Sequence, residues 1–167
     1  VGGLGSPAAL YLACSGIGTI TLADHDTVEL TNLQRQILHT MASIGGSKAE
    51  SAANRITAIN PDIQVVPLMT QLNEKSLKSL VPEHDVVLDC SDNFFTRQQV
   101  NRACVASKIP LVSGAAVQFD GQLTVFDPRN AHSPCYHCIF SEEENIESLP
   151  CSVTGIFAPL TGMIGSL

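Results

Sequence analysis

The chain has 167 residues, of which 44% are hydrophobic and 15% are charged, and its formal net charge is −7. This length and composition are typical of a single globular domain with a sizeable core. The negative charge argues against a nucleic-acid partner, which normally requires a basic face, whereas a nucleotide needs only a few local donors. No apolar run reaches the roughly 18 residues of a membrane helix, so we expect no membrane partner.

The two ends of the chain and its cysteines suggest a context. The sequence begins at Val1 on a glycine turn and stops at Leu167 within an apolar pattern, so we interpret it as a fragment cut at both ends. Its six cysteines are too sparse for a disulfide scaffold, which favours a reducing, cytoplasmic compartment. Cys14, Cys90 and Cys104 occur in apolar helix or strand patterns and are expected to be buried.

A glycine-rich turn leads into the first predicted helix. Gly3 and Gly5 permit a tight turn and a close approach of the backbone to a phosphate group. The helix N-terminus adds unpaired N–H groups that favour an anion. Ser6 is predicted to cap this helix and Pro7 to occupy its first turn. In a doubly wound sheet the strand before such a turn is central, and that strand is expected to be missing from this fragment.

The first strand within the sequence is predicted at residues 19–23, which form a short apolar run. Asp24 follows this run and lies 19 residues after Gly5. An acidic residue at about this distance from a glycine turn holds the ribose hydroxyls in nucleotide-binding folds. Asp24 is therefore a candidate ribose ligand.

An unusual polar turn comes next and contains Asn32, Gln34, Arg35 and Gln36. Asn32 and Arg35 are three residues apart, so on a helical turn they project in the same direction. An amide and a guanidinium aimed together suit a phosphate better than a nicotinamide. The alternative is a solvated loop in which Asn32 only caps a turn.

A helix is predicted after this turn, ending near Ile59. Ser47 and Glu50 form a capping-box pattern at its start, which places Lys48 in the first turn. A cation there opposes the helix dipole by about 0.3–1 kcal/mol, and a bound anion would remove that penalty. The alternative is a surface lysine whose stem lies along the protein.

The remaining pattern alternates between strands and helices. Strands are predicted at 63–68, 84–90, 110–115 and, at an edge, 122–127, and helices are predicted at 74–80 and 95–107. The strand at 84–90 is apolar enough to be covered on both faces. This order predicts an α/β fold, a Rossmann-like and mostly parallel sheet with helices on both faces.

A polar segment follows the predicted strand at 84–90. Asp92 and Asn93 would lie beyond the carboxyl end of that strand, where open α/β sheets bind ligands. Asp92 is therefore a candidate catalytic or metal-binding carboxylate. The alternative for Asp92 is to cap the next helix, and Asp89 is a competing acid with a structural interpretation.

The last third of the chain contains a C-x-x-C pair, Cys135 and Cys138. Two thiolates are half of a tetrahedral zinc site. His132 or His137 could complete it, although a second C-x-x-C beyond Leu167 is the simpler interpretation.

One more cysteine stands alone after an acidic run at residues 142–147. Cys151 is either a nucleophile on a loop or an inert thiol.

In combination, these motifs resemble the ThiF/MoeB/HesA family, the bacterial relatives of the ubiquitin-activating enzymes. The resemblance covers essentially the whole chain and rests on the glycine turn, Asp24 with Asp26, the turn at Asn32 to Gln36, Lys48, the segment from Asp89 to Asn93, and the C-x-x-C pair. It implies a homodimer that adenylates the C-terminal Gly-Gly carboxylate of a small ubiquitin-like sulfur-carrier protein. ATP would be consumed, with Mg²⁺ as its cofactor, and pyrophosphate would be released, in a pathway of the thiamine or molybdopterin type.

The resemblance also implies roles by position. The nucleotide site would contain Gly3, Gly5, Asp24, Asn32, Gln34, Arg35, Lys48, Asp92 and Asn93. Catalysis would depend on Arg35, Lys48, Asp92 and Cys151. Asp92 would bind Mg²⁺, and Cys135 and Cys138 would be the first half of a structural Cys₄ zinc site. Residues 1–128 would form the adenylation core, and residues 129–167 would carry the half zinc site, the catalytic-cysteine loop and the start of a further helix.

Two other functions are compatible with the same predicted fold. A NAD-dependent oxidoreductase would use the glycine turn and Asp24, but would leave Asn32, Arg35, Lys48 and Asp92 without a task. A catalytically silent module, like the inactive partner subunit of some eukaryotic activating enzymes, would not need a complete set of nucleotide-site residues.

Overall fold

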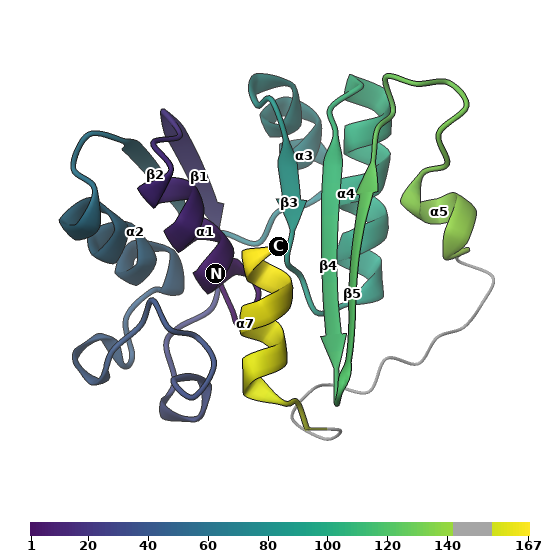
Figure 1. Cartoon of the computed structure of the whole chain (residues 1–167). Helices are drawn as coiled ribbons and strands as arrows, with labels where there is room; N and C mark the ends of the chain where they lie inside the picture. Colours follow the sequence, from purple (N-terminus) through teal and green to yellow (C-terminus); the bar gives the residue numbers. More distant parts are fainter. Residues whose placement is uncertain (142–154) are drawn as a thin grey trace. The chain divides into compact units, whose positions relative to one another are not determined.

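The computed structural model describes residues 1–141 and 155–167 (Figure 1). Its contacts divide the chain into two compact units. The first unit comprises Val1–Gln71 and Phe157–Leu167, and the second comprises Leu72–Ile156. None of the described helices is both long enough and apolar enough to cross a membrane.

The first unit combines a parallel pair of strands with helices. Its elements are α1 (Gly5–Cys14), β1 (Thr19–Ala23), η1 (Leu30–Asn32), η2 (Met41–Ser43), α2 (Lys48–Ile59), β2 (Gln64–Leu68) and α7 (Ala158–Ser166). Strands β1 and β2 pair in parallel, with Thr19 opposite Gln64 and Ala23 opposite Leu68. Helix α2 packs against both strands, while α1 packs against α2 and lies beside α7 (Figure 1).

Small side chains build the core of the first unit. The buried cluster consists of Ala9, Ala13, Leu22, Leu38, Ala52, Ala53, Ile56 and Ile63. On α2 the buried positions recur at helical spacing, which is the pattern of a helix with one apolar face. Ser47 caps α2 as predicted, because its side chain accepts a hydrogen bond from Glu50 N at 3.3 Å.

The start of α1 differs from the prediction. The helix begins at Gly5 with Leu4 as its N-cap residue, and Ser6 lies inside it, so the predicted cap at Ser6 is wrong. The backbone already turns before Ser6, because Ser6 N donates to Gly2 O at 2.9 Å. The Ser6 hydroxyl is left to donate to Val1 O at 3.2 Å.

The second unit contains a three-stranded sheet in the order β3-β4-β5. Its elements are α3 (Glu74–Leu80), η3 (Val81–Glu83), β3 (Val87–Asp89), α4 (Phe94–Ser107), β4 (Leu111–Val117), β5 (Asp120–Phe126) and α5 (Tyr136–Ile139). Strands β3 and β4 are parallel, and β4 and β5 form an antiparallel hairpin. The α/β class with parallel strands is therefore confirmed.

Strand β3 is shorter and less covered than predicted. It contains three residues in place of the predicted segment 84–90, and Val86 and Leu88 remain 41% and 37% exposed. Within the described residues, the expected burial of this segment on both faces is therefore not found.

Buried apolar side chains from several elements form the core of the second unit. The buried cluster consists of Leu77, Val81, Val100, Ala103, Cys104, Leu111, Phe126 and Tyr136. Tyr136 anchors α5 in this cluster, since its ring packs edge-on against Phe126 and lies 4.8 Å from the Phe140 ring. Helix α5 thereby holds the C-x-x-C pair next to α4.

Candidate nucleotide and zinc sites

The glycine turn of the first unit is packed closely by two distant segments. A Cβ atom at Gly3 would lie 3.0 Å from Thr161 Oγ1 on α7 and 3.3 Å from Arg35 Cγ. Only a residue without a side chain fits there unless a neighbour moves. The turn therefore places the backbone at Gly3 directly beside the arginine that was predicted to bind phosphate.

A buried histidine that no sequence motif indicated holds the same turn. His39 is 6% exposed; its Nε2 lies 3.1 Å from Val1 O and its Nδ1 lies 3.0 Å from Ser51 Oγ. Because a carbonyl can only accept, Nε2 carries the proton and Nδ1 accepts from Ser51. Burial lowers the pKa of His39, which favours this neutral form.

Asp24 lies directly after β1, as predicted for a ribose ligand. Its Oδ2 accepts from the backbone nitrogen of Val1 at 2.6 Å, and its Oδ1 accepts from Asp26 N at 3.0 Å. Burial raises the pKa of Asp24, whereas the hydrogen bond from Asp26 N and the nearby charge of Lys48 lower it. Asp24 is a carboxylate at neutral pH, as aspartate ordinarily is.

Lys48 is buried, and the alternative of a surface lysine is wrong. The residue is 6% exposed, and its Nζ lies 2.8 Å from Asp26 Oδ2. The Asp26 side chain is 53% exposed, so solvent screens this pair on one side. The ammonium group is thus held at the first turn of α2, within electrostatic range of Asp24.

The polar turn after η1 leaves one cation without an acidic partner. Asn32 O accepts hydrogen bonds from Arg35 N at 3.1 Å and Gln36 N at 3.0 Å, which closes the turn. The Arg35 guanidinium makes a long contact of 3.5 Å with Thr31 O, and no carboxylate of the described chain forms an ion pair with it. Its charge is therefore available to an anion. Gln34 is exposed.

Asp92 and Asn93 lie in the second unit, on the turn between β3 and α4. The helix cap is Asn93, whose Oδ1 accepts from Thr96 N at 2.8 Å, so the alternative of a capping Asp92 is wrong. Asp92 is exposed, and its carboxylate forms no hydrogen bond or ion pair within the described part of the chain. An exposed carboxylate of this kind fits Mg²⁺, which takes one or two carboxylates together with phosphate oxygens.

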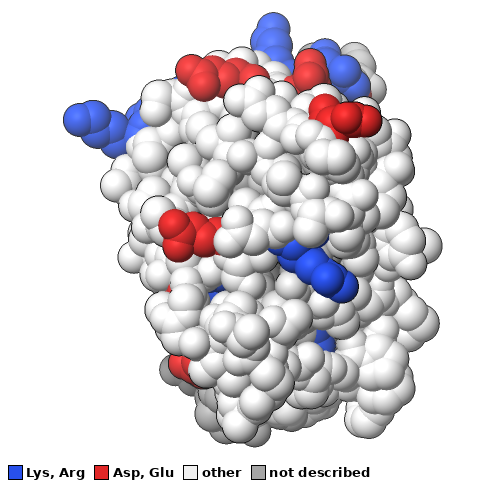
Figure 2. Space-filling view, turned by 90° about the vertical axis from the view of Figure 1, so that its left-hand side faces the viewer, with Lys and Arg blue, Asp and Glu red and all other residues white. Residues whose placement is uncertain are grey.

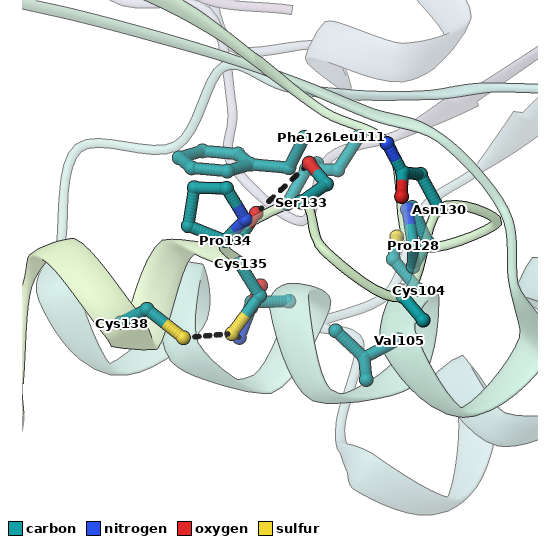
Figure 3. Close-up of a pocket in the computed structure, with 12 residues that line it drawn as sticks. Cys104, Val105, Leu111, Phe126, Pro128, Asn130, Ser133, Pro134, Cys135 and Cys138 are labelled. Atoms are coloured by element: carbon teal, nitrogen blue, oxygen red, sulfur yellow. Dashed lines mark hydrogen bonds between the residues drawn. The ribbon is translucent and has the colours of Figure 1, made fainter.

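The two sulfur atoms of the C-x-x-C pair face each other across 3.5 Å (Figure 3). At this separation both can reach one zinc ion with bonds of about 2.3 Å. Burial raises the pKa of Cys135, but hydrogen bonds from the Cys138 and His137 backbones and from Asn101 Nδ2 outweigh it. The lowered pKa favours the thiolate that zinc requires.

A cavity of about 250 Å³ adjoins this pair and is also lined by Cys104. Cys104 comes from α4 (Figure 3). Burial raises the pKa of Cys104 to about 12, so it stays a thiol. His132 and His137 are exposed. Among the described residues, no third side chain lies close enough to Cys135 and Cys138 to bind the same metal ion. Three potential metal ligands do lie within reach of one another elsewhere in the described chain, at Asp24, His25 and Asp26.

The other cysteines follow the predictions only in part. Cys104 is buried as expected, whereas Cys14 is exposed and Cys90 is partly buried. Burial raises the pKa of Cys90 to about 11. Cys151, the candidate nucleophile, lies outside the described residues.

Charged side chains are scattered over the face drawn in Figure 2. The basic atoms occur in separate places among the described residues and form no continuous patch on this face. This distribution agrees with the net charge of −7.

The family follows from comparison with known proteins. Residues 1–167 match the ThiF family. The chain belongs to the ThiF family. This confirms the resemblance drawn from the motifs.

The relatives of this ThiF-family chain include bacterial and eukaryotic proteins. The molybdopterin-synthase adenylyltransferase of Escherichia coli K12 is 49% identical over 167 residues, which cover 100% of this chain and 66% of the relative. The sulfur carrier protein ThiS adenylyltransferase of the same organism is 47% identical, with the same coverage. The adenylyltransferase and sulfurtransferase MOCS3 of Dictyostelium discoideum is 45% identical over 99% of this chain and 39% of the relative.

Solved structures of E. coli MccB share the fold of this ThiF-family chain. The structure of MccB with ATP superposes with a TM-score of 0.80 at 28% identity and covers 99% of this chain and 50% of MccB. The structure of MccB with MccA-N7isoASN gives a TM-score of 0.83 at 26% identity, over 99% and 51% of the two chains. This chain thus spans 66% of the bacterial relatives and about half of MccB.

Two residues of this ThiF-family chain have structural roles that the motifs did not indicate. They are His39 at the glycine turn and Arg97, which is buried in the second unit. Asp26 is part of the motif with Asp24, and the structure gives it a role beside Lys48. The partners of His39 and Arg97 lie too far away in sequence for a local pattern to indicate them.

Proposed function

We propose that the complete protein is an ATP-dependent adenylyltransferase. It activates the C-terminal glycine carboxylate of a ubiquitin-like sulfur-carrier protein as an acyl-adenylate and releases pyrophosphate. The observation that carries this proposal is the Arg35 side chain, which lies beside Gly3 and has no acidic partner among the described residues. A second cation of the same unit, the buried Lys48, is held by Asp26. The relatives named adenylyltransferases, at 49% and 47% identity, support the reaction class.

The proposed chemistry needs charge neutralisation more than proton transfer. A carboxylate oxygen of the carrier attacks the α-phosphorus of ATP, the bond to the bridging oxygen breaks, and its electron pair leaves with pyrophosphate. The attacking carboxylate is already ionised at neutral pH, so no general base is required. Arg35 and Lys48 offset the negative charge of the phosphates and of the leaving group. Asn32 and Gln34 would add neutral donors at the same turn.

Asp24, the glycine turn and the turn after β3 complete the proposed nucleotide site. Asp24 is ionised and would accept hydrogen bonds from the ribose hydroxyls. The backbone at Gly3 and Gly5 would approach the phosphates. Asp92 would hold Mg²⁺, with Asn93 beside it, and the bound ion would offset further phosphate charge.

Residues 129–167 carry the remaining proposals. Cys135 and Cys138 would bind a structural zinc ion together with a second pair of ligands. Cys151 would act after adenylation, in thioester or persulfide chemistry with the carrier. We therefore expect Cys151→Ala to keep ATP–pyrophosphate exchange and to impair sulfur transfer to the carrier; equal loss of both steps would contradict this division of roles.

The decisive experiment is ATP–pyrophosphate exchange by the complete protein. It is run with and without each small Gly-Gly-ended carrier protein of the same genome, and we expect exchange to require one particular carrier. That carrier names the pathway, thiamine or molybdopterin. Sedimentation of the same sample tests the proposed homodimer. Absence of exchange with every carrier, from a folded protein, would overturn the proposal.

Variants connect this exchange to the site. Arg35→Ala and Asp92→Ala are expected to abolish exchange and keep the fold. Arg55→Ala is the matched control, because Arg55 is exposed on α2 of the same unit as Arg35. A fluorescence change on titration with NADH, combined with unimpaired ATP binding by Arg35→Ala, would favour an oxidoreductase. Folded protein that binds neither nucleotide would favour the silent module.

A further inference from the structure

A buried arginine in the second unit lies outside the proposed nucleotide and zinc sites. Arg97 lies in the first turn of α4, and its side chain is 10% exposed. Its guanidinium donates to Ser113 Oγ at 3.2 Å, to Gly114 O at 2.9 Å and to the carbonyl of Ser91. One planar group thus connects β4 to the turn between β3 and α4.

Asp89 anchors the same turn from the other side. It is 3% exposed, and its Oδ1 accepts from Ser91 N at 3.0 Å and from Ser91 Oγ at 2.6 Å. Its Oδ2 lies 3.9 Å from Arg97 Nη1 and has no hydrogen-bond partner in the described chain. Since desolvation offsets the attraction, such a buried pair adds little net stability. Its geometric effect is to hold Ser91 by its N–H, its hydroxyl and its carbonyl.

The neighbours of Asp92 are therefore both held in place. Ser91 precedes Asp92 and is fixed by Asp89 and Arg97, while Asn93 follows it and caps α4. The exposed carboxylate of Asp92 has no partner among the residues that the structure describes. The turn thus restrains the backbone of Asp92 and leaves its carboxylate available for a ligand.

We propose that Arg97 is a positioning residue for Asp92. Acting through Ser91, it holds the Asp92 carboxylate in the place where that group binds a divalent cation. This inference rests on the proposed function, in which the cation accompanies ATP. In this proposal Arg97 itself contacts neither the cation nor ATP. A merely structural arginine would instead tie β4 to α4 without affecting the cation site.

The test measures cation binding directly. The complete protein is saturated with a non-hydrolysable ATP analogue and titrated with Mn²⁺, whose free form is followed by electron paramagnetic resonance. We expect Arg97→Met to weaken Mn²⁺ binding about 10–100-fold, the usual effect of removing a group that supports a metal ligand. Affinity for the analogue without metal should stay within about twofold. Arg97→Lys should be intermediate, because an ammonium group keeps the charge but cannot bridge Ser91 and Ser113.

A control and a reference variant make the outcomes separable. Arg102→Met changes an exposed arginine on the same helix and should leave Mn²⁺ binding unchanged. Asp92→Asn removes the proposed ligand itself. If Asp92→Asn weakens Mn²⁺ binding and Arg97→Met does not, the positioning role is overturned and the proposed function stands. If Asp92→Asn has no effect, the metal assignment of the proposed function fails as well.

Two further outcomes are decisive. Equal losses of Mn²⁺ affinity and of metal-free nucleotide affinity in Arg97→Met would show a general structural role and overturn the inference. If Arg97→Met does not fold, Arg97→Lys decides, because it keeps the buried charge. Wild-type Mn²⁺ affinity in folded Arg97→Lys would overturn the inference, and a weakened affinity would support it.

Discussion

Replacing Lys48 by methionine should separate catalysis from stability. The substitution removes the ammonium group and keeps an unbranched apolar stem in the buried position. The lost ion pair joins Lys48 Nζ to Asp26 Oδ2 at 2.8 Å, with side chains that are 8% and 53% exposed. A pair that solvent screens on one side contributes about 0–1 kcal/mol.

A second effect acts in the opposite direction. Lys48 lies at the first turn of α2, where a cation opposes the helix dipole by about 0.3–1 kcal/mol. The two contributions nearly cancel, so the free energy of unfolding should change by no more than about 1 kcal/mol. For a domain of this size that corresponds to a Tm shift of about 2–4 °C. Loss of a cation that stabilises the transition state typically lowers kcat about 10²–10³-fold.

The assay combines ATP–pyrophosphate exchange with thermal unfolding of the complete protein. Lys78→Met is the matched control, because Lys78 forms an exposed pair with Glu74 at 2.7 Å, and it should change neither quantity appreciably. A Lys48→Met protein that keeps exchange within threefold of wild type would refute the role of Lys48 toward phosphate. A Tm lower by 10 °C or more would show that the buried lysine is mainly structural.

Three further predictions concern packing, protonation and metal. Gly165→Ala should lower the free energy of unfolding by about 1–3 kcal/mol in urea titrations, because its Cβ would overlap the Leu4 carbonyl and the Pro7 ring. Its control is Gly162→Ala, which has open space around the added methyl group and should be neutral or stabilising by up to about 1 kcal/mol. Burial lowers the pKa of His39 below its usual 6.5, so the unfolded chain binds the proton more readily. Stability should therefore fall as the pH drops below about 6.5, and His39→Gln should reduce this fall between pH 7 and 5.5. Cys138→Ser should lower the zinc content measured by mass spectrometry, whereas Cys104→Ser should not.

Each of these predictions has a clear contrary result. Equal stability of the two glycine variants would mean that α7 does not approach α1 as closely as described. A pH profile of His39→Gln parallel to that of wild type would show that His39 does not bind its proton differently on unfolding. Zinc loss in the Cys104 variant equal to that in the Cys138 variant would place Cys104 in the metal site.

Local patterns predicted local structure well. The strand at 19–23 and the helix at 74–80 agree with the structure. A helix depends on contacts between residues three or four positions apart, and a strand is visible as a short apolar run, so spacing and composition in the sequence reveal both. The predictions were wrong where the path of the backbone or contacts with other segments determined a residue's role or exposure. Ser6 does not cap α1 because the chain turns earlier, and Cys14 is exposed although its pattern is apolar.

The sequence by itself determined the α/β class, the family and the identity of the polar residues grouped around the glycine turn and after β3. Motif order and local spacing are sufficient for these conclusions. Only the tertiary structure decided which groups meet. The hydrogen bond between His39 and Val1, the ion pair between Lys48 and Asp26, and the bonds of Arg97 to β4 join residues 38, 22 and 16 or 17 positions apart. Such contacts depend on how whole elements pack, and no spacing within one element encodes them.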